Sequence, residues 1–227
     1  MALPSPLTDA DRQRVSDAVS RAEGQSAGEI VTILAERSDG YTDVALAWAA
    51  FVALLALTVL AIAPDFYIGL YERLSGGWVH EWTPRQLFAL AAVVAAAKFG
   101  GMVLLQLIVP LRFFLVPGPI KARRVHDRAL RAFRIGAEQR TTGRTGILIY
   151  LSMREHRAEV LADAAIATKV DAEVWADALA ALLAEVRRGD VAGGLCAAVD
   201  KVGAVLATHF PRAEDDVNEL PDRLIEV

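Results

Sequence analysis

Two long apolar runs near the middle of the chain, residues 44–63 and 87–109, constrain its fold more than any other feature. The first run contains no charged side chain and is followed by Pro64, and the second is followed by Pro110. As a helix, either run is long enough to cross the hydrocarbon core of a bilayer, about 30 Å. A core helix of this length would carry a polar stripe, which the first run lacks. The sequence therefore predicts a hairpin of two membrane-spanning helices.

The composition agrees with a membrane protein and excludes some other classes. Hydrophobic residues make up 54% of the 227 residues, above the roughly 45–50% of soluble domains. The net charge is -4 and no basic stripe is interleaved with aromatic residues, so a nucleic-acid partner is not expected. The single cysteine, Cys196, allows no intrachain disulfide and is expected to be a buried, inert thiol.

Lysine and arginine are more frequent after the second run than in the loop 64–86 between the runs. By the positive-inside rule, this asymmetry predicts a bacterial inner (plasma) membrane protein with a periplasmic loop and with both termini in the cytoplasm. Four basic residues after the second run are expected to face lipid headgroups, which makes membrane lipid a predicted partner. These residues are Arg112, Lys121, Arg123 and Arg124.

The loop between the runs is rich in aromatic residues. Five of its residues recur at helical spacing, namely Tyr67, Leu70, Tyr71, Leu74 and Trp78. This pattern predicts a short helix at the membrane interface, with its rings at headgroup depth.

Small residues recur every four positions in both runs, and such stripes allow close approach of helix backbones. They are Ala45, Ala49 and Ala53 in the first run and Ala92, Ala96 and Gly100 in the second. Contact between the two spans is the simplest expectation, and a homo-oligomer would use the same device. The abundance of alanine in the runs explains the pattern equally well.

Lys98 lies in the middle of the second run. A charge at this depth is costly, which makes Lys98 a candidate functional residue. Snorkelling toward the interface or hydration in an oligomer would also account for it.

The remaining chain alternates helical and strand patterns. We predict helices over residues 7–24, 119–140, 171–188 and 190–211, and strands over residues 29–36, 147–152 and 157–163. The fold class is therefore α/β: a small sheet of about three strands covered by helices, with the transmembrane hairpin inserted. The predicted divisions are residues 1–43, 44–63, 64–86, 87–109, 110–211 and an acidic tail, 212–227. Apolar Leu220, Leu224 and Ile225 of the tail are expected to dock on the same domain.

Three segments resemble the TPM domain family, in particular its bacterial membrane-anchored branch. They are residues 28–33 (GEIVTI), 144–152 (RTGILIYLS) and 157–163 (RAEVLAD). The family includes a thylakoid-lumen acid phosphatase and a photosystem II repair protein. The resemblance implies a TPM-like fold, and either phosphatase activity or binding of a divalent metal by acidic residues near strand ends.

Four acidic residues, Glu29, Asp163, Asp171 and Glu173, are the candidates for such a site. If they converge at one end of the sheet, their carboxylate oxygens suit a hard cation such as Ca²⁺ or Mg²⁺. The alternative is structural, with Asp171 as a helix cap, Glu173 as a first-turn acid and the other two as strand-edge charges.

The predicted function is that of a membrane-anchored binding or accessory module, acting on a protein partner or as a homo-oligomer. A metal-dependent phosphatase is the first alternative. A subunit of a small oligomeric transporter or channel is the second.

Overall fold

The computed structural model describes residues 7–75, 82–136, 145–212 and 219–227. The chain forms two compact units. The α/β unit comprises Met1–Asp39 and Gly118–Val227, and the hairpin unit is Gly40–Pro117. Trp78 and the predicted end of the basic helix, residues 137–140, lie outside the described residues.

The α/β unit contains a mixed sheet in the order β3-β2-β1-β4. Its strands are β1 (Glu29–Ala35), β2 (Gly146–Ser152), β3 (Arg157–Ala162) and β4 (Ile225–Glu226). Strand β1 pairs in parallel with β2 and β4, and β2 pairs antiparallel with β3. The sheet therefore has four strands, and the prediction of about three was wrong because the tail supplies one.

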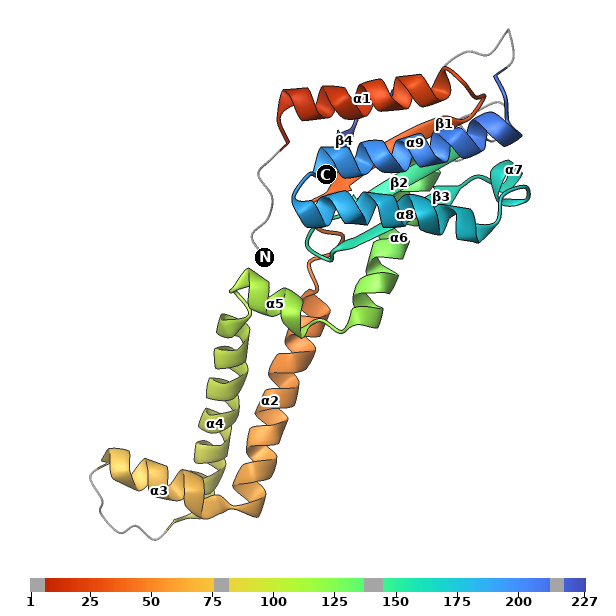
Figure 1. Cartoon of the computed structure of the whole chain (residues 1–227). Helices are drawn as coiled ribbons and strands as arrows, with labels where there is room; N and C mark the ends of the chain where they lie inside the picture. Colours follow the sequence, from red (N-terminus) through yellow and green to blue (C-terminus); the bar gives the residue numbers. More distant parts are fainter. Residues whose placement is uncertain (1–6, 76–81, 137–144, 213–218) are drawn as a thin grey trace. The chain divides into compact units, whose positions relative to one another are not determined.

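Helices cover both faces of this sheet (Figure 1). They are α1 (Asp9–Glu23), α6 (Gly118–Gly136), α7 (Ala164–Ala167), α8 (Ala172–Arg188) and α9 (Val191–His209). One buried cluster joins α1, α8 and α9 to one face through residues such as Ile30 and Ile149. A second cluster joins α6 to the other face through residues such as Val31 and Leu148. The strands are buried on both sides, which explains their continuous apolar runs.

Local sequence signals set several helix ends. Thr8 caps α1 in a reciprocal capping box with Asp11. Gly189 follows α8 with a φ of 93°, a left-handed conformation that favours glycine. Asp190 caps α9 through the backbone N–H of Gly193, at 2.7 Å. Asp171 occupies the N-cap position of α8, but its side chain makes no capping hydrogen bond.

The C-terminal tail docks on its own unit, which confirms that prediction. Leu220 and Leu224 are buried, and Ile225 packs against the cluster beneath α6. The backbone N–H of Val227 donates to the Leu34 carbonyl, and the N–H of Glu36 donates to the Val227 carbonyl. The tail thus covers the edge of β1 that β2 leaves open.

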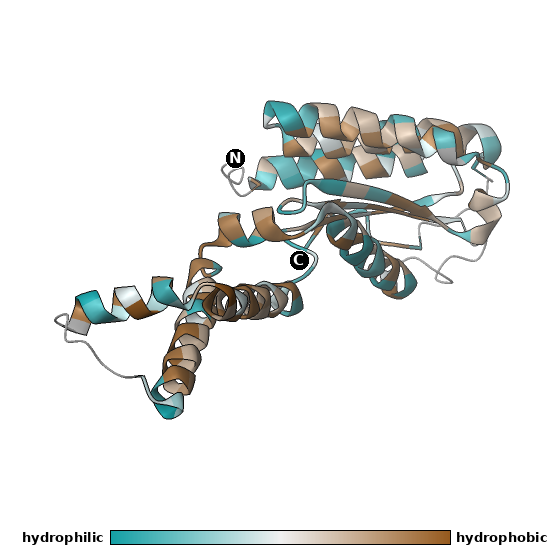
Figure 2. Ribbon diagram, turned by 90° about the horizontal axis from the view of Figure 1, so that it is seen from below, coloured by the Kyte–Doolittle hydropathy of each residue, from teal (hydrophilic) through white to brown (hydrophobic). Residues whose placement is uncertain are grey.

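The hairpin unit consists of α2 (Thr42–Ile62), α3 (Pro64–Ser75), α4 (Pro84–Leu105) and α5 (Val109–Leu115). Hydrophobic residues dominate its long helices (Figure 2). The second apolar run was predicted to form one helix to Val109, and this prediction is wrong. Helix α4 ends at Leu105. Pro110 lies in the first turn of α5, where its missing N–H is tolerated.

Candidate functional site

Three helices of the described chain are long and apolar enough to cross a membrane. They are α2, α4 and α9, with mean hydropathies of 2.5, 2.1 and 1.5 over their most apolar windows. The structure buries 11% of that window in α2, none of it in α4 and 50% of it in α9. Helix α9 is thus largely covered by the protein, whereas α2 and α4 are mostly exposed.

The apolar character of α9 is explained by its place in the protein core. A Cβ atom at Gly194 would lie 2.7 Å from the Leu182 carbonyl oxygen of α8. A Cβ atom at Gly203 would lie 2.6 Å from the Cβ of Ala22 in α1. Helix α9 therefore packs tightly between two neighbours, and its apolar residues already have protein partners.

Helices α2 and α4 instead expose large apolar side chains. The exposed fraction is 80% for Ile62, 63% for Leu54, 77% for Phe88 and 65% for Leu104. Contiguous apolar surface of this kind is rare on soluble monomers and marks an interface with a partner or a membrane. Contact with a membrane or a partner would remove this apolar surface from water.

Polar contacts and small residues hold the hairpin together within its own unit. The side-chain N–H of Gln106 donates to the Ala45 carbonyl at 3.0 Å, and the indole N–H of Trp48 donates to the Leu115 carbonyl at 3.0 Å. Ala49 and Ala56 are buried on α2. The stripe on α4 behaves differently from the prediction, since Ala92 and Ala96 are exposed and open space surrounds Gly100.

Lys98 is exposed on α4 and forms no ion pair with the described residues. The basic residues after the hairpin fall in two places. Arg112 on α5 donates to the Thr42 hydroxyl at 3.1 Å, within the hairpin unit. Lys121, Arg123 and Arg124 lie on the first turns of α6 in the α/β unit, where Arg124 pairs with Asp39 at 3.2 Å.

Two of the four predicted metal ligands lie at the same end of the sheet. Glu29 pairs with Gly146 in the β1–β2 register, and the backbone N–H of Asp163 donates to the Gly146 carbonyl at 2.9 Å. Both carboxylate oxygens of Glu29 are used, because they accept the backbone N–H groups of Glu219 and Leu220, each at 3.1 Å. Glu29 thus holds the tail.

The other predicted ligands do not complete a metal site. Asp163 is buried, and its Oδ1 accepts from the Ala164 N–H while its Oδ2 has no partner in the described chain. Asp171 and Glu173 are exposed at the start of α8. In the described residues, no three His, Cys, Asp or Glu side chains lie close enough together to hold a metal ion. Because Ca²⁺ and Mg²⁺ take six or more oxygen ligands, a metal bound at these residues stays a prediction.

A buried carboxyl group that the sequence does not reveal completes the contact with the tail. Glu23 of α1 accepts the backbone N–H of Ile30 at 2.8 Å. Burial raises the pKa of Glu23 to about 9, with the nearby charges of Glu29 and Asp222 acting in the same direction. Asp222 accepts a short hydrogen bond from the Ser20 hydroxyl. Glu29 and Asp222 thus fasten the tail to β1 and α1, and Glu23 joins α1 to β1 beside them.

A second polar cluster lies at the carboxyl ends of β1 and β2. The buried carboxylate of Glu155 accepts the backbone N–H of Ser38 at 3.0 Å and the Ser152 hydroxyl at 2.5 Å. The Ser38 hydroxyl donates to Ser152 at 2.9 Å and lies 3.1 Å from the hydroxyl of Tyr150. Burial raises the pKa of Tyr150, so its phenol stays neutral. The cluster fixes the segment from which the chain leaves the α/β unit.

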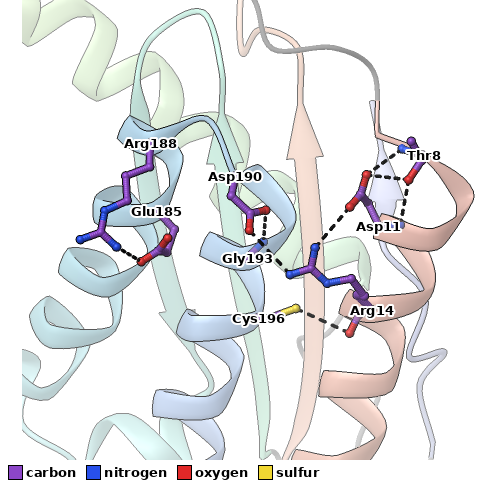
Figure 3. A network of polar contacts seen from close by, with 8 residues as sticks. All are labelled: Thr8, Asp11, Arg14, Glu185, Arg188, Asp190, Gly193 and Cys196. Atoms are coloured by element: carbon purple, nitrogen blue, oxygen red, sulfur yellow. Dashed lines mark hydrogen bonds and ion pairs between the residues drawn. The ribbon is translucent and has the colours of Figure 1, made fainter.

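Cys196 belongs to a polar network between α1 and the start of α9 (Figure 3). Its thiol donates to the Arg14 carbonyl at 3.6 Å, and Arg14 reaches Asp11 and Asp190 at 3.4 Å and 3.6 Å. Burial raises the pKa of the Cys196 thiol, which lowers its reactive thiolate fraction. Cys196 is only partly buried, and not buried as predicted, because it lies at the edge of the contact between α1 and α9.

Comparison with known proteins supports the fold. No protein-family model matches the sequence, and no curated protein matches it. The NMR structure of the BA42 protein from the psychrophilic bacterium Bizionia argentinensis is similar, with a TM-score of 0.55 and 18% sequence identity. The alignment covers 97% of this chain and 95% of that chain. At this identity, the likeness concerns the fold alone.

Proposed function

We propose that the chain is an integral membrane protein in which α2 and α4 cross the bacterial inner membrane as a hairpin. The observation that carries this proposal is the exposed apolar surface of the two helices, 11% and 0% of whose most apolar windows are buried. Contact of this apolar surface with bilayer hydrocarbon carries little cost in free energy, whereas its contact with water is unfavourable. Helix α9 stays in the protein core and is not a third span.

The orientation follows from the basic residues. Arg112, Lys121, Arg123 and Arg124 follow α4 in the sequence, so the α/β unit and both termini are cytoplasmic by the positive-inside rule. The same residues attract anionic headgroups, each contributing about 1 kcal/mol near the surface.

The α/β unit then acts as a TPM-like binding or accessory module at the cytoplasmic face. Its conspicuous buried carboxylates serve the fold, since Glu29 binds the tail and Glu155 binds Ser38 and Ser152. A protein partner or a second copy of the chain is the proposed ligand class. No group of three or more His, Cys, Asp or Glu side chains in the described residues favours a phosphatase.

Cysteine labelling tests location and orientation together. In a Cys196→Ser background, Asp65→Cys places a thiol on exposed α3 and Asp177→Cys places one on exposed α8. In spheroplasts, a membrane-impermeant maleimide is expected to label the Asp65→Cys variant at once and the Asp177→Cys variant only after lysis. The reverse pattern would overturn the orientation. Recovery of either variant in the soluble fraction would overturn the membrane anchor itself.

A further inference from the structure

A cavity of about 230 Å³ lies between α3 and the beginning of α4 in the hairpin unit. One of its residues, Tyr71, comes from α3, and Trp82 directly precedes the cap of α4. The others are Gln86, Ala89, Leu90 and Val93 of α4. Pockets that enclose a whole small molecule usually exceed about 300 Å³, so this one is sized for part of a larger ligand.

The cavity changes from polar to apolar along the axis of α4. Gln86, Ala89, Leu90 and Val93 recur at intervals of three and four, so they share one face of the helix. At 1.5 Å per residue this face is about 10 Å long. Trp82 and Gln86 supply polar groups at one end, and Val93 closes the other end with an apolar side chain. An amphiphile lying parallel to the helix has this same gradient.

The polar end contains a buried hydrogen-bond donor, the indole N–H of Trp82. The indole nitrogen of Trp82 is buried and has no hydrogen-bond partner in the described chain. The ring is held against Tyr71, with ring centres 5.1 Å apart and planes at 67°. A buried N–H without an acceptor is costly, so a ligand that brings a carbonyl oxygen would be favoured.

Neighbouring contacts keep this end of the cavity in place. The carbonyl oxygen of the Gln86 side chain accepts the N–H and the hydroxyl of Thr83, at 2.9 Å and 2.8 Å, in the capping box of α4. The capping box therefore fixes Thr83 and Gln86, which follow Trp82 in the sequence.

We propose that this cavity binds the ester and upper acyl region of one glycerophospholipid. The Trp82 N–H donates to an ester carbonyl oxygen, and the acyl chain lies along Ala89, Leu90 and Val93. The lining residues that the structure describes carry no charged side chain, which favours this region of the lipid over its headgroup. The inference rests on the proposed membrane hairpin, since only then does the start of α4 lie at the depth of lipid esters, where tryptophan is enriched.

Native mass spectrometry of the full-length protein in detergent, titrated with dioleoylphosphatidylglycerol, tests the site. Ala89→Phe fills the cavity and is expected to weaken retention of one lipid at least tenfold. Ala92→Phe makes the same change at an exposed position outside the lining and is expected to retain the lipid. Equal retention by both variants would overturn the site, and a thermal midpoint within the range of the control shows that Ala89→Phe is folded.

A second measurement tests the contact between Trp82 and the ester. The wild type is expected to prefer the diester lipid over its diether analogue by about fivefold, the effect of one hydrogen bond. Trp82→Phe should abolish this preference, and an unchanged preference would overturn the assigned contact. Alkaline carbonate extraction of the same membranes reports on the hairpin separately. Protein that stays in the pellet without a specific lipid refutes only the site, whereas protein that is extracted refutes the proposed anchor as well.

Discussion

At the scale of single residues, protonation of Glu23 is coupled to the stability of the fold. Its carboxyl group is buried, and its pKa is raised to about 9 from an ordinary value of 4.5. Between these values the folded protein holds a proton that the unfolded chain has lost. The free energy of unfolding therefore falls as the pH rises through this window, by at most about 1.4 kcal/mol per pH unit.

Glu23→Gln removes this dependence, because glutamine keeps an acceptor for the Ile30 N–H and has no proton to lose. We expect the thermal midpoint of the wild type in detergent to fall more between about pH 5 and pH 9 than that of the variant. Glu173→Gln, at an exposed position, is the control and should behave like the wild type. Identical pH slopes for the wild type and Glu23→Gln would contradict the assignment.

The contrast between Thr8 and Glu23 shows which residue roles are readable from sequence. The capping role of Thr8 was predictable because its partner, Asp11, is three residues away. The role of Glu23 was not, because its neighbour Asp222 lies at the other end of the chain and a glutamate in the last turn of a helix normally faces solvent. The contact of Glu29 with the tail was not predictable for the same reason, since Glu219 and Leu220 lie far from Glu29 in the sequence.

At the scale of elements, the packing of α2 depends on small residues. Ala49 is fully buried on α2, whereas its neighbour Ala50 is exposed. Ala49→Leu should therefore wedge the hairpin open and destabilise it by about 1–3 kcal/mol. Ala50→Leu should have little effect. Thermal unfolding of both variants in detergent is the measurement, and equal midpoints would mean that the helices do not pack through Ala49.

Helices α1, α6, α8 and α9 were predictable from their apolar periodicity, and α2 and α4 from their long continuous apolar runs. Strand β4 was not, because two residues, Ile225 and Glu226, carry no periodic pattern and gain their strand geometry only from pairing with β1. The end of α4 was misplaced because the apolar run continues past Leu105, while the helix stops before Pro110. The apolar composition of the run predicts a location in the membrane, but it does not predict the residue at which the helix ends.

At the scale of the whole molecule, the hairpin unit is an insertion between two paired strands. The pairing of β1 with β2, from Glu29 with Gly146 to Ala35 with Ser152, joins segments on either side of the insertion. Both buried clusters of the α/β unit are built from residues of that unit alone. The points where the chain leaves and returns are fixed within it, by the Asp39–Arg124 ion pair and by a hydrogen bond from Arg157 to the Gly118 carbonyl at 3.3 Å.

The α/β unit should therefore fold without the hairpin. Replacing residues 40–117 by a flexible glycine–serine linker is expected to give a soluble protein with mixed helix and strand content, which unfolds cooperatively on heating and does not sediment with uncharged phosphatidylcholine vesicles. The same deletion combined with Leu148→Asp, which places a charge in the core, should not fold. Circular dichroism and ultracentrifugation distinguish these outcomes. An insoluble or non-cooperative product from the first deletion would mean that the hairpin is needed to bring β1 and β2 together, in addition to its proposed role as a membrane anchor.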